Sequence, residues 1–159
     1  MSISVKQFYI WVVGWTIFLV LLIIFMQNTN FQDNIENLVI EKRKTFIEIL
    51  VNNSNNFLMY VIYFPISVFL LLFDLITIGV ASSIALDIYG VSKTLSLLPH
   101  AILEYPNLLF YSFLSFALFM EVIKNPRIST IKKFFSANYR YYLISYLILI
   151  ISAFIEGSI

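Results

Sequence analysis

The chain has 159 residues, of which 60% are hydrophobic and 12% charged, and its formal net charge is +1. Soluble domains contain about 45–50% apolar and roughly 25% charged residues, so this composition excludes a water-soluble globular fold and indicates an integral membrane protein. The near-neutral charge offers no electrostatic surface for nucleic acid, and the absence of cysteine excludes disulfides, iron–sulfur clusters and thiolate zinc sites.

The first apolar block, residues 8–26, is uncharged and has Trp11 and Trp15 near its start. It is longer than the apolar core of a signal peptide and no small-residue cleavage site follows it, which predicts a retained transmembrane helix. Residues 31–51 then carry apolar side chains at helical spacing with charged residues between them. This pattern predicts an amphipathic helix, either at the membrane surface or solvated and packed on the other spans.

The next block, residues 57–86, contains one charge, Asp74, and its length lies between those of one and two crossings. It predicts two short helices with Asp74 at the break, or one long tilted helix. The chain is expected to form a single membrane domain, 1–159, with an all-α fold: a polytopic transmembrane helix bundle of four to five spans. The expected spans are 8–26, 57–73, 75–90, 95–120 and 139–156, with a cytoplasmic connector at 121–138.

Basic residues indicate how the chain is oriented, because they gather on the cytoplasmic side. With five crossings, Lys6 and the five basic residues between 124 and 140 lie inside, six basic residues against four outside. With four crossings the N-terminus lies outside and the ratio becomes eight to two. Both alternatives place the connector 121–140 in the cytoplasm and the C-terminus outside.

A polar stripe runs along the predicted span 95–120. Its members follow one another at steps of three or four residues, so they share one helical face: Ser96, His100, Glu104, Asn107, Tyr111 and Ser115. A charged side chain facing lipid is costly, which predicts that this face turns towards protein or water. Pro106 removes a backbone hydrogen bond and is expected to kink the helix beside Glu104.

Two further segments carry polar residues at helical spacing. One set is Gly79, Ser83, Asp87 and Gly90, and the other is Ser145, Ser152 and Glu156. We therefore predict an intramembrane polar cluster formed by Asp87, Ser96, His100, Glu104, Asn107, Tyr111 and Glu156.

Three interpretations of this cluster are open. His100 and Glu104 lie one helical turn apart and can reach one metal ion, although every other ligand would be a carboxylate or water. Acid–base or nucleophilic chemistry is the second interpretation, but no serine stands in a recognisable nucleophile motif. The third is a structural His–Glu pair that fixes helix register. We predict the third, with no catalytic residue, no metal and no cofactor.

The segment "LLPHAILEYP" resembles the Pro-His-Gly…Glu-x-Pro signature of the stage II sporulation protein M family, small multi-pass bacterial membrane proteins. Asn55 and Asn56 match the family's Asn-Asn pair before a span, and residues 154–156 match its closing Phe-Ile-Glu. The likeness covers residues 52–156. The family's glycine after Pro-His is Ala101 here.

This resemblance implies a bacterial cytoplasmic membrane protein that acts as scaffold or accessory subunit, in envelope remodelling or in bacteriocin and peptide export or immunity. No catalytic activity comes with the family. The expected partners are membrane lipids, other membrane proteins or an ATPase subunit, and a second copy of the chain, but not nucleic acid. Two alternatives are a polar pathway for protons, cations or peptide, and an intramembrane hydrolase that uses His100 and Glu104.

Overall fold

The computed structural model describes residues 5–28, 45–97 and 101–158, and these ranges are almost entirely helical. The elements are α1 (Val5–Asn28), α2 (Phe46–Ile62), a short 3₁₀ turn η2 (Phe64–Ile66), α3 (Ser67–Leu97), α4 (Ala101–Lys124) and α5 (Ile128–Ser158). The predicted all-α, multi-pass helix bundle is therefore confirmed. Within the described ranges, four segments are long and apolar enough to cross a membrane: Val5–Asn28, Phe64–Leu95, Ala101–Lys124 and Ile128–Ser158.

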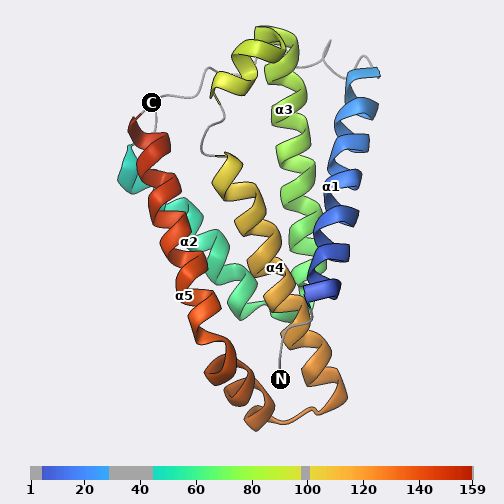
Figure 1. Ribbon diagram of the computed structural model, residues 1–159, viewed down its shortest axis with the longest axis vertical. Helices are drawn as coiled ribbons and strands as arrows, with labels where there is room; N and C mark the ends of the chain where they lie inside the picture. The colour runs from blue at the N-terminus through green and yellow to red at the C-terminus, as the bar shows by residue number, and fades with distance from the viewer. Residues whose placement is uncertain (1–4, 29–44, 98–100, 159) are drawn as a thin grey trace.

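The directions of the helices show which part of the chain's path through the bundle α2 forms. In Figure 1, α1 and α3 both run upwards, α4 runs down and α5 runs up again. Because α1 and α3 run the same way, the chain has to return between them, and α2 is the described part of that return. Its 17 residues measure about 26 Å, close to the ~30 Å thickness of a bilayer core.

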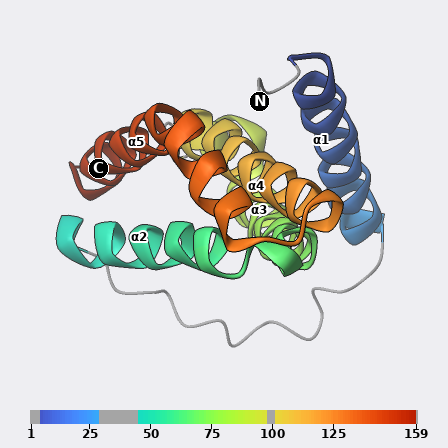
Figure 2. The same ribbon diagram turned by 90° about the horizontal axis from the view of Figure 1, so that it is seen from below.

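The packing leaves α1 on the outside. Seen from below, α3 and α4 lie in the middle, with α1 on one side and α2 and α5 on the other (Figure 2). α2 and α4 both pack on α5, whereas α1 packs on α3 and α4. The outer side of α1 carries exposed apolar side chains, among them Ile10, Ile17, Leu21 and Phe25. In a bilayer this face contacts lipid.

α2 begins at a reciprocal capping box. The hydroxyl of Thr45 accepts the backbone N–H of Glu48, and the Glu48 carboxylate accepts the backbone N–H of Thr45 at 2.7 Å. The surface helix predicted at 31–51 overlaps α2 only in residues 46–51, and residues 29–44 lie outside the described part. α2 does not end there: it continues to Ile62 and packs on α5 inside the bundle.

The break between the second and third helices differs from the prediction. It lies at residues 63–66, and Asp74 sits within the continuous first part of α3. Pro65 agrees with this position, because it has no N–H to donate to the preceding turn and favours the start of a new helical segment over the interior of a helix. Asp74 needs no turn exposed to water, since two side chains of α2 donate hydrogen bonds to it.

A kink at Gly90 divides α3. Gly90 has φ +71° and ψ 168°, a conformation essentially restricted to glycine. Beyond it, the buried Thr94 hydroxyl donates a hydrogen bond of 2.8 Å to the carbonyl of Ala85, which ties the last turns back onto the helix. The predicted end of a span at residue 90 coincides with this kink. The span predicted at 95–120 does not hold, because residues 95–97 belong to α3 and α4 begins at Ala101.

The predicted connector 121–138 is largely helical. α4 continues to Lys124, a turn occupies residues 125–127, and α5 starts at Ile128, eleven residues before the predicted span 139–156. The turn is closed by hydrogen bonds from the N–H of Arg127 and the hydroxyl of Thr130 to the carbonyl of Asn125. α4 and α5 thus form one long helical hairpin. α4 also runs through Pro106 as a single helix.

Candidate functional site

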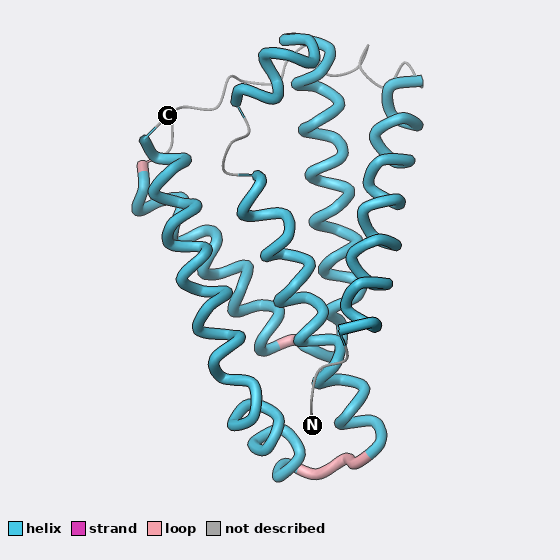
Figure 3. The backbone as a smooth tube through the Cα atoms, viewed as in Figure 1, coloured by secondary structure: helices cyan, strands magenta, loops and turns pink. Residues whose placement is uncertain are grey.

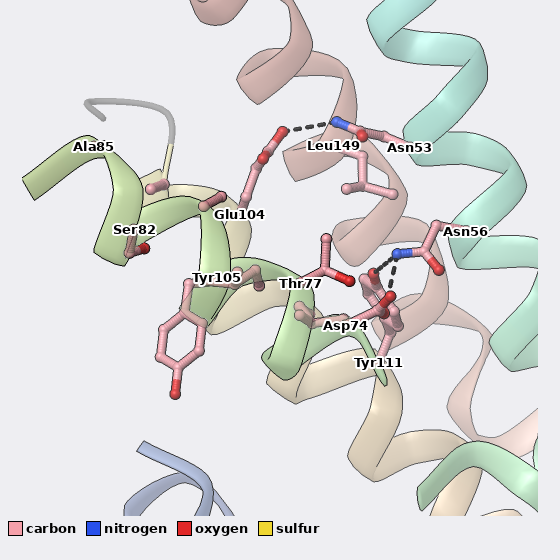
Figure 4. Close-up of a pocket in the computed structure, with 14 residues that line it drawn as sticks. Asn53, Asn56, Asp74, Thr77, Ser82, Ala85, Glu104, Tyr105, Tyr111 and Leu149 are labelled. Atoms are coloured by element: carbon pink, nitrogen blue, oxygen red, sulfur yellow. Dashed lines mark hydrogen bonds between the residues drawn. The ribbon is translucent and has the colours of Figure 1, made fainter. Parts of the chain in front are cut away.

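A pocket of about 330 Å³ lies between α2, α3 and α4, at the depth of the spans (Figure 4). Leu149 of α5 contributes to its wall. The lining residues are Asn53, Asn56, Asp74, Thr77, Ile78, Ala81, Ser82, Ala85, Ala101, Glu104, Tyr105, Leu108, Tyr111 and Leu149. The pocket therefore combines apolar walls with two carboxylates and two amides.

The pocket exists because one face of α3 carries small side chains. Its lining residues on α3 recur at alternating steps of three and one positions from Asp74 to Ala85, so they occupy one side of the helix. Ala81, Ser82 and Ala85 are too small to fill the space to α4, where Ala101 stands opposite. From Asp74 to Ala85 the pocket extends over twelve residues of α3, about 16 Å along the helix axis.

Asp74 is held by two donors from α2. Its Oδ2 accepts the Tyr60 hydroxyl at 2.8 Å and the Asn56 side-chain amide at 3.2 Å. Tyr60 is fully buried. These bonds fix the carboxylate at the lower end of the pocket and connect the end of α2 to α3 across the turn at residues 63–66.

Glu104 has a matching donor one turn earlier on α2. Its Oε1 accepts the side-chain amide of Asn53 at 2.7 Å. Figure 4 shows Asn53 and Asn56 reaching from α2 towards Glu104 and Asp74. Because they are three residues apart, the two asparagines share one face of α2, and each holds one carboxylate of the pocket.

The hydrogen bonds of Asn53 and Asn56 to the two carboxylates of the pocket explain the polar run "NNSNN" at residues 52–56. Ser54 of the same run makes a 3.2 Å contact with the Tyr146 hydroxyl on α5. In the sequence, Asn56 stands out only as a match to a family pattern, and Asn53 does not stand out by itself. Two asparagines three residues apart on a helix between apolar spans were the available signal.

The polar residues of α4 face two different neighbouring helices. Glu104 and Tyr111 line the pocket beside α2, and the Tyr111 hydroxyl accepts the Asn56 amide at 3.5 Å. Asn107 is buried against α5, where it exchanges two hydrogen bonds with Ser145. Ser115, fully buried, donates to the carbonyl of Tyr111 on its own helix.

The other members of the predicted cluster do not join them. Asp87 is exposed, and its carboxylate accepts the Gln27 amide of α1 at 3.1 Å. The face of α3 that includes Gly79 and Asp87 points towards α1, where Gly79 meets Leu22, so Asp87 lies on another side of α3 than the pocket. Among the described residues that line the pocket, Glu156 does not occur.

Two predicted members lie at the α3–α4 junction. Ser96 belongs to the last turn of α3 and is not on the helix of Glu104, so the predicted stripe is divided between two helices. His100 lies outside the described residues. Across the part of the chain that is described, no group of three His, Cys, Asp or Glu side chains lies close enough together to hold a metal ion.

The comparison with protein families decides which family the chain belongs to. The family model described as stage II sporulation protein M matches residues 8–159. The chain belongs to this family. No curated protein and no solved structure matches the chain.

The match to the stage II sporulation protein M family extends beyond residues 52–156, on which the resemblance rested, and includes α1. Asn56 and Glu104, two of the residues that carried the resemblance, both line the pocket. Together with its apolar helices, this membership makes the chain an integral membrane protein of the stage II sporulation protein M family.

Proposed function

We propose that the chain is a non-enzymatic accessory subunit of a membrane complex for envelope remodelling or for peptide export or immunity. The α4–α5 hairpin supplies its contact with an acidic surface of a partner protein. The observation that carries this proposal is a projecting basic tip. The hairpin extends well beyond the lower ends of α1, α2 and α3 (Figure 3).

The length of α5 agrees with a projection out of the bilayer. Its 31 residues measure about 46 Å, roughly 15 Å more than a hydrocarbon core. Tyr139 and Tyr141 are exposed on α5 about three turns from its start. Exposed tyrosines at this distance are typical of the membrane–water interface, which leaves the first turns of α5 in water.

The projecting part is strongly basic. Residues 121–140 contain five basic side chains and one acidic side chain, a net charge of 5 − 1 = +4. Glu121 pairs with Lys124 at 3.5 Å. Arg127, Lys132 and Lys133 are exposed, and Arg127 and Lys133 border a polar hollow at the turn. This concentration of charge favours the cytoplasmic side for the tip.

The interior supports a scaffold role. Hydrogen bonds between side chains join α2 to α3, α4 and α5, and α4 to α5. Such bonds hold helices in register in a medium that offers no water in exchange. A fixed bundle presents the basic tip in a constant position.

The proposal is tested by copurification in mild detergent from the native membrane. The double variant Lys132→Gln, Lys133→Gln should reduce the amount of recovered partner about 5- to 30-fold, if each exposed charge contributes about 0.5–1 kcal/mol. The recovered protein should be released by high salt and should be an ATPase or another subunit of such a complex.

Two controls define the result. Lys132→Arg with Lys133→Arg keeps both charges and should retain the partner. Lys93→Gln removes a basic residue of α3 beyond the Gly90 kink and should have no effect, because α3 ends at the end of the bundle opposite the α4–α5 turn (Figure 1). A chain that purifies alone, or a glutamine pair that affects only adhesion to anionic vesicles, contradicts the proposed protein contact.

A further inference from the structure

The exposed surface of α5 changes from basic to apolar just after Arg140. Before this point its exposed side chains include Lys132, Lys133 and Ser136. From residue 143 to residue 154 every exposed residue of α5 is apolar, namely Leu143, Ile144, Leu147, Ile151 and Phe154. In a bilayer the apolar part lies in the hydrocarbon core, which places Arg140 at the level of the lipid headgroups, beside the exposed Tyr139 and Tyr141.

Arg140 and part of this apolar surface share one face of the helix. Ser136, Arg140, Ile144, Leu147 and Ile151 follow one another at steps of four, four, three and four residues, and all five are exposed. From Arg140 to Ile151 the face extends about 16 Å along the helix axis. Because α5 lies at the outer side of the bundle (Figure 2), a lipid molecule can reach this face.

Tyr139 orients the Arg140 side chain. The Nε–H of Arg140 donates to the Tyr139 hydroxyl at 3.2 Å, and the guanidinium carbon lies 5.8 Å from the centre of the Tyr139 ring. A guanidinium has five N–H donors, and among the described residues only Tyr139 accepts one from Arg140. The Tyr139 hydroxyl accepts in this contact, so its own proton also stays available to a ligand.

These donors match a phosphate group. The planar guanidinium can donate two parallel hydrogen bonds to two phosphate oxygens, and an exposed hydroxyl such as that of Tyr139 or Ser136 can add another. A free phosphate ion would make no use of the apolar side chains that follow Arg140 on the same face. The ligand that matches the whole face therefore carries a phosphate at headgroup level and an acyl chain that extends into the bilayer.

The charge around Arg140 selects among phospholipids. Residues 121–140 contain five basic side chains and one acidic side chain. This surplus of positive charge disfavours the cationic group that a zwitterionic headgroup carries beside its phosphate, and it favours a lipid whose phosphate is not balanced.

From these observations we infer that this face of α5 binds one anionic phospholipid. Arg140 and Tyr139 hold the phosphate, and an acyl chain lies along Ile144, Leu147 and Ile151. The site does not depend on the partner contact proposed above, which is tested at Lys132 and Lys133.

The experiment counts lipids bound to the full chain by native mass spectrometry, with the protein released from detergent micelles. Dioleoylphosphatidylglycerol is the anionic probe, and dioleoylphosphatidylcholine is the zwitterionic probe with the same acyl chains. The first phosphatidylglycerol should bind at least about fivefold more tightly than the first phosphatidylcholine, the ratio expected from about 1 kcal/mol per basic residue at an anionic lipid surface.

Variants of the two headgroup residues test the assignment. Arg140→Gln should weaken binding of the first phosphatidylglycerol about fivefold or more and remove the preference over phosphatidylcholine. Arg140→Lys keeps the charge but loses the planar pair of donors, so its binding should lie between the two. Tyr139→Phe removes one hydroxyl and should weaken binding about two- to fivefold.

Arg127→Gln is the matched control. It also removes one exposed basic side chain, but at the α4–α5 turn, about 18 Å from Arg140 along the axis of α5. This separation exceeds the Debye length at physiological salt, about 8 Å, so binding of the first lipid should be unchanged. Arg140 and Tyr139 are exposed, and helical circular dichroism verifies that their variants fold. If Arg140→Gln loses helical structure, Arg140→Lys and Tyr139→Phe decide.

Glycerol phosphate tests whether the acyl chain belongs to the ligand. It has the phosphate without the chains, and at the concentration of the lipid it should not compete. The inference is overturned by equal binding of the two lipids, by unchanged binding in folded Arg140→Gln, by an equal loss in Arg127→Gln, or by displacement of the lipid with glycerol phosphate.

Discussion

Asn107 and Ser145 exchange two hydrogen bonds across the interface of α4 and α5. The Asn107 side-chain amide donates to the carbonyl of Ser145 at 2.9 Å, and the Ser145 hydroxyl donates to Oδ1 of Asn107 at 2.7 Å. Both residues are buried. Serine lets the two backbones approach closely, and the reciprocal pair sets one register between the helices.

Removing this pair should destabilise the bundle. Asn107→Ala leaves the Ser145 hydroxyl without an acceptor in a medium without water, and we expect a loss of about 1–2 kcal/mol in the free energy of unfolding. Ser145→Ala should cost roughly 0.5–1 kcal/mol, and the double variant less than the sum of the two. Unfolding in mixed micelles measures all three, and strict additivity contradicts a direct bond.

The end of α5 meets the start of α2 at Gly157. A Cβ atom at this position would lie 3.0 Å from both Cα and Cβ of Phe46 and 3.1 Å from its backbone nitrogen. Backbone atoms cannot move aside as a flexible side chain does, so Gly157→Ala should lower the free energy of unfolding by about 1–3 kcal/mol.

Gly14→Ala is the matched control for this contact. No atom of the described residues lies within 4 Å of the Cβ position at Gly14, which is also inside a helix. Alanine there should be neutral or stabilise the chain by up to about 1 kcal/mol through its helix propensity. Equal effects at the two positions would show that α2 and α5 do not meet at Gly157.

Gly90 should be sensitive to substitution for a different reason. Across the described ranges no atom lies within 4 Å of the position of a Cβ at residue 90, so Gly90→Ala creates no clash with them. The positive φ alone should cost about 1–3 kcal/mol, and the substitution should favour a straighter α3. Thermal unfolding compares it with Gly14→Ala. A spin-label distance between the two ends of α3 reports the change in the kink, and an unchanged distance with no loss of stability contradicts the role of Gly90.

If α2 crosses the membrane, residues 6 and 125 lie on one side of the membrane and residue 158 lies on the other. The start of α1 and the α4–α5 turn lie at one end of the bundle, and the end of α5 lies at the other (Figure 1). The chain has no cysteine, so single substitutions can be labelled without background.

A membrane-impermeant maleimide should label Lys6→Cys and Asn125→Cys from one side of the membrane and Ser158→Cys from the other. These three positions are exposed. Permeabilised cells provide the control that each thiol reacts. If Lys6→Cys and Ser158→Cys react from the same side, α2 does not cross the membrane and the four-crossing arrangement is correct.

Several features of the fold followed from local sequence. Residues 8–26 predicted α1 because a long uncharged run has no stable place outside a membrane. The end of the span at residue 90 coincides with the Gly90 kink. The charge of Asp74 predicts the break after α2 at the wrong position, because the helix is interrupted at Pro65 and Asp74 is hydrogen-bonded by side chains of α2.

The candidate site was predictable only in part. Glu104, Asn107 and Tyr111 were recognised because their spacing places them on one helical face. Asn53 and Tyr60 were not, because their importance lies in what they touch: Asn53 bonds Glu104, 51 positions away in sequence, and Tyr60 bonds Asp74 across a turn. The prediction that Asp87 belongs to the same polar cluster is wrong, since helical spacing identifies the face of a helix but not the neighbouring helix that this face contacts.

Composition and hydrophobic run length, which are properties of each segment by itself, determined that this chain is an all-helical membrane protein. Tertiary structure decided which polar groups meet, because a polar side chain in a bilayer has to find its partner on another helix, and that partner depends on how the helices cross. The antiparallel placement of α2 beside α4 and α5 therefore turned an asparagine-rich segment into one wall of a pocket with two carboxylates.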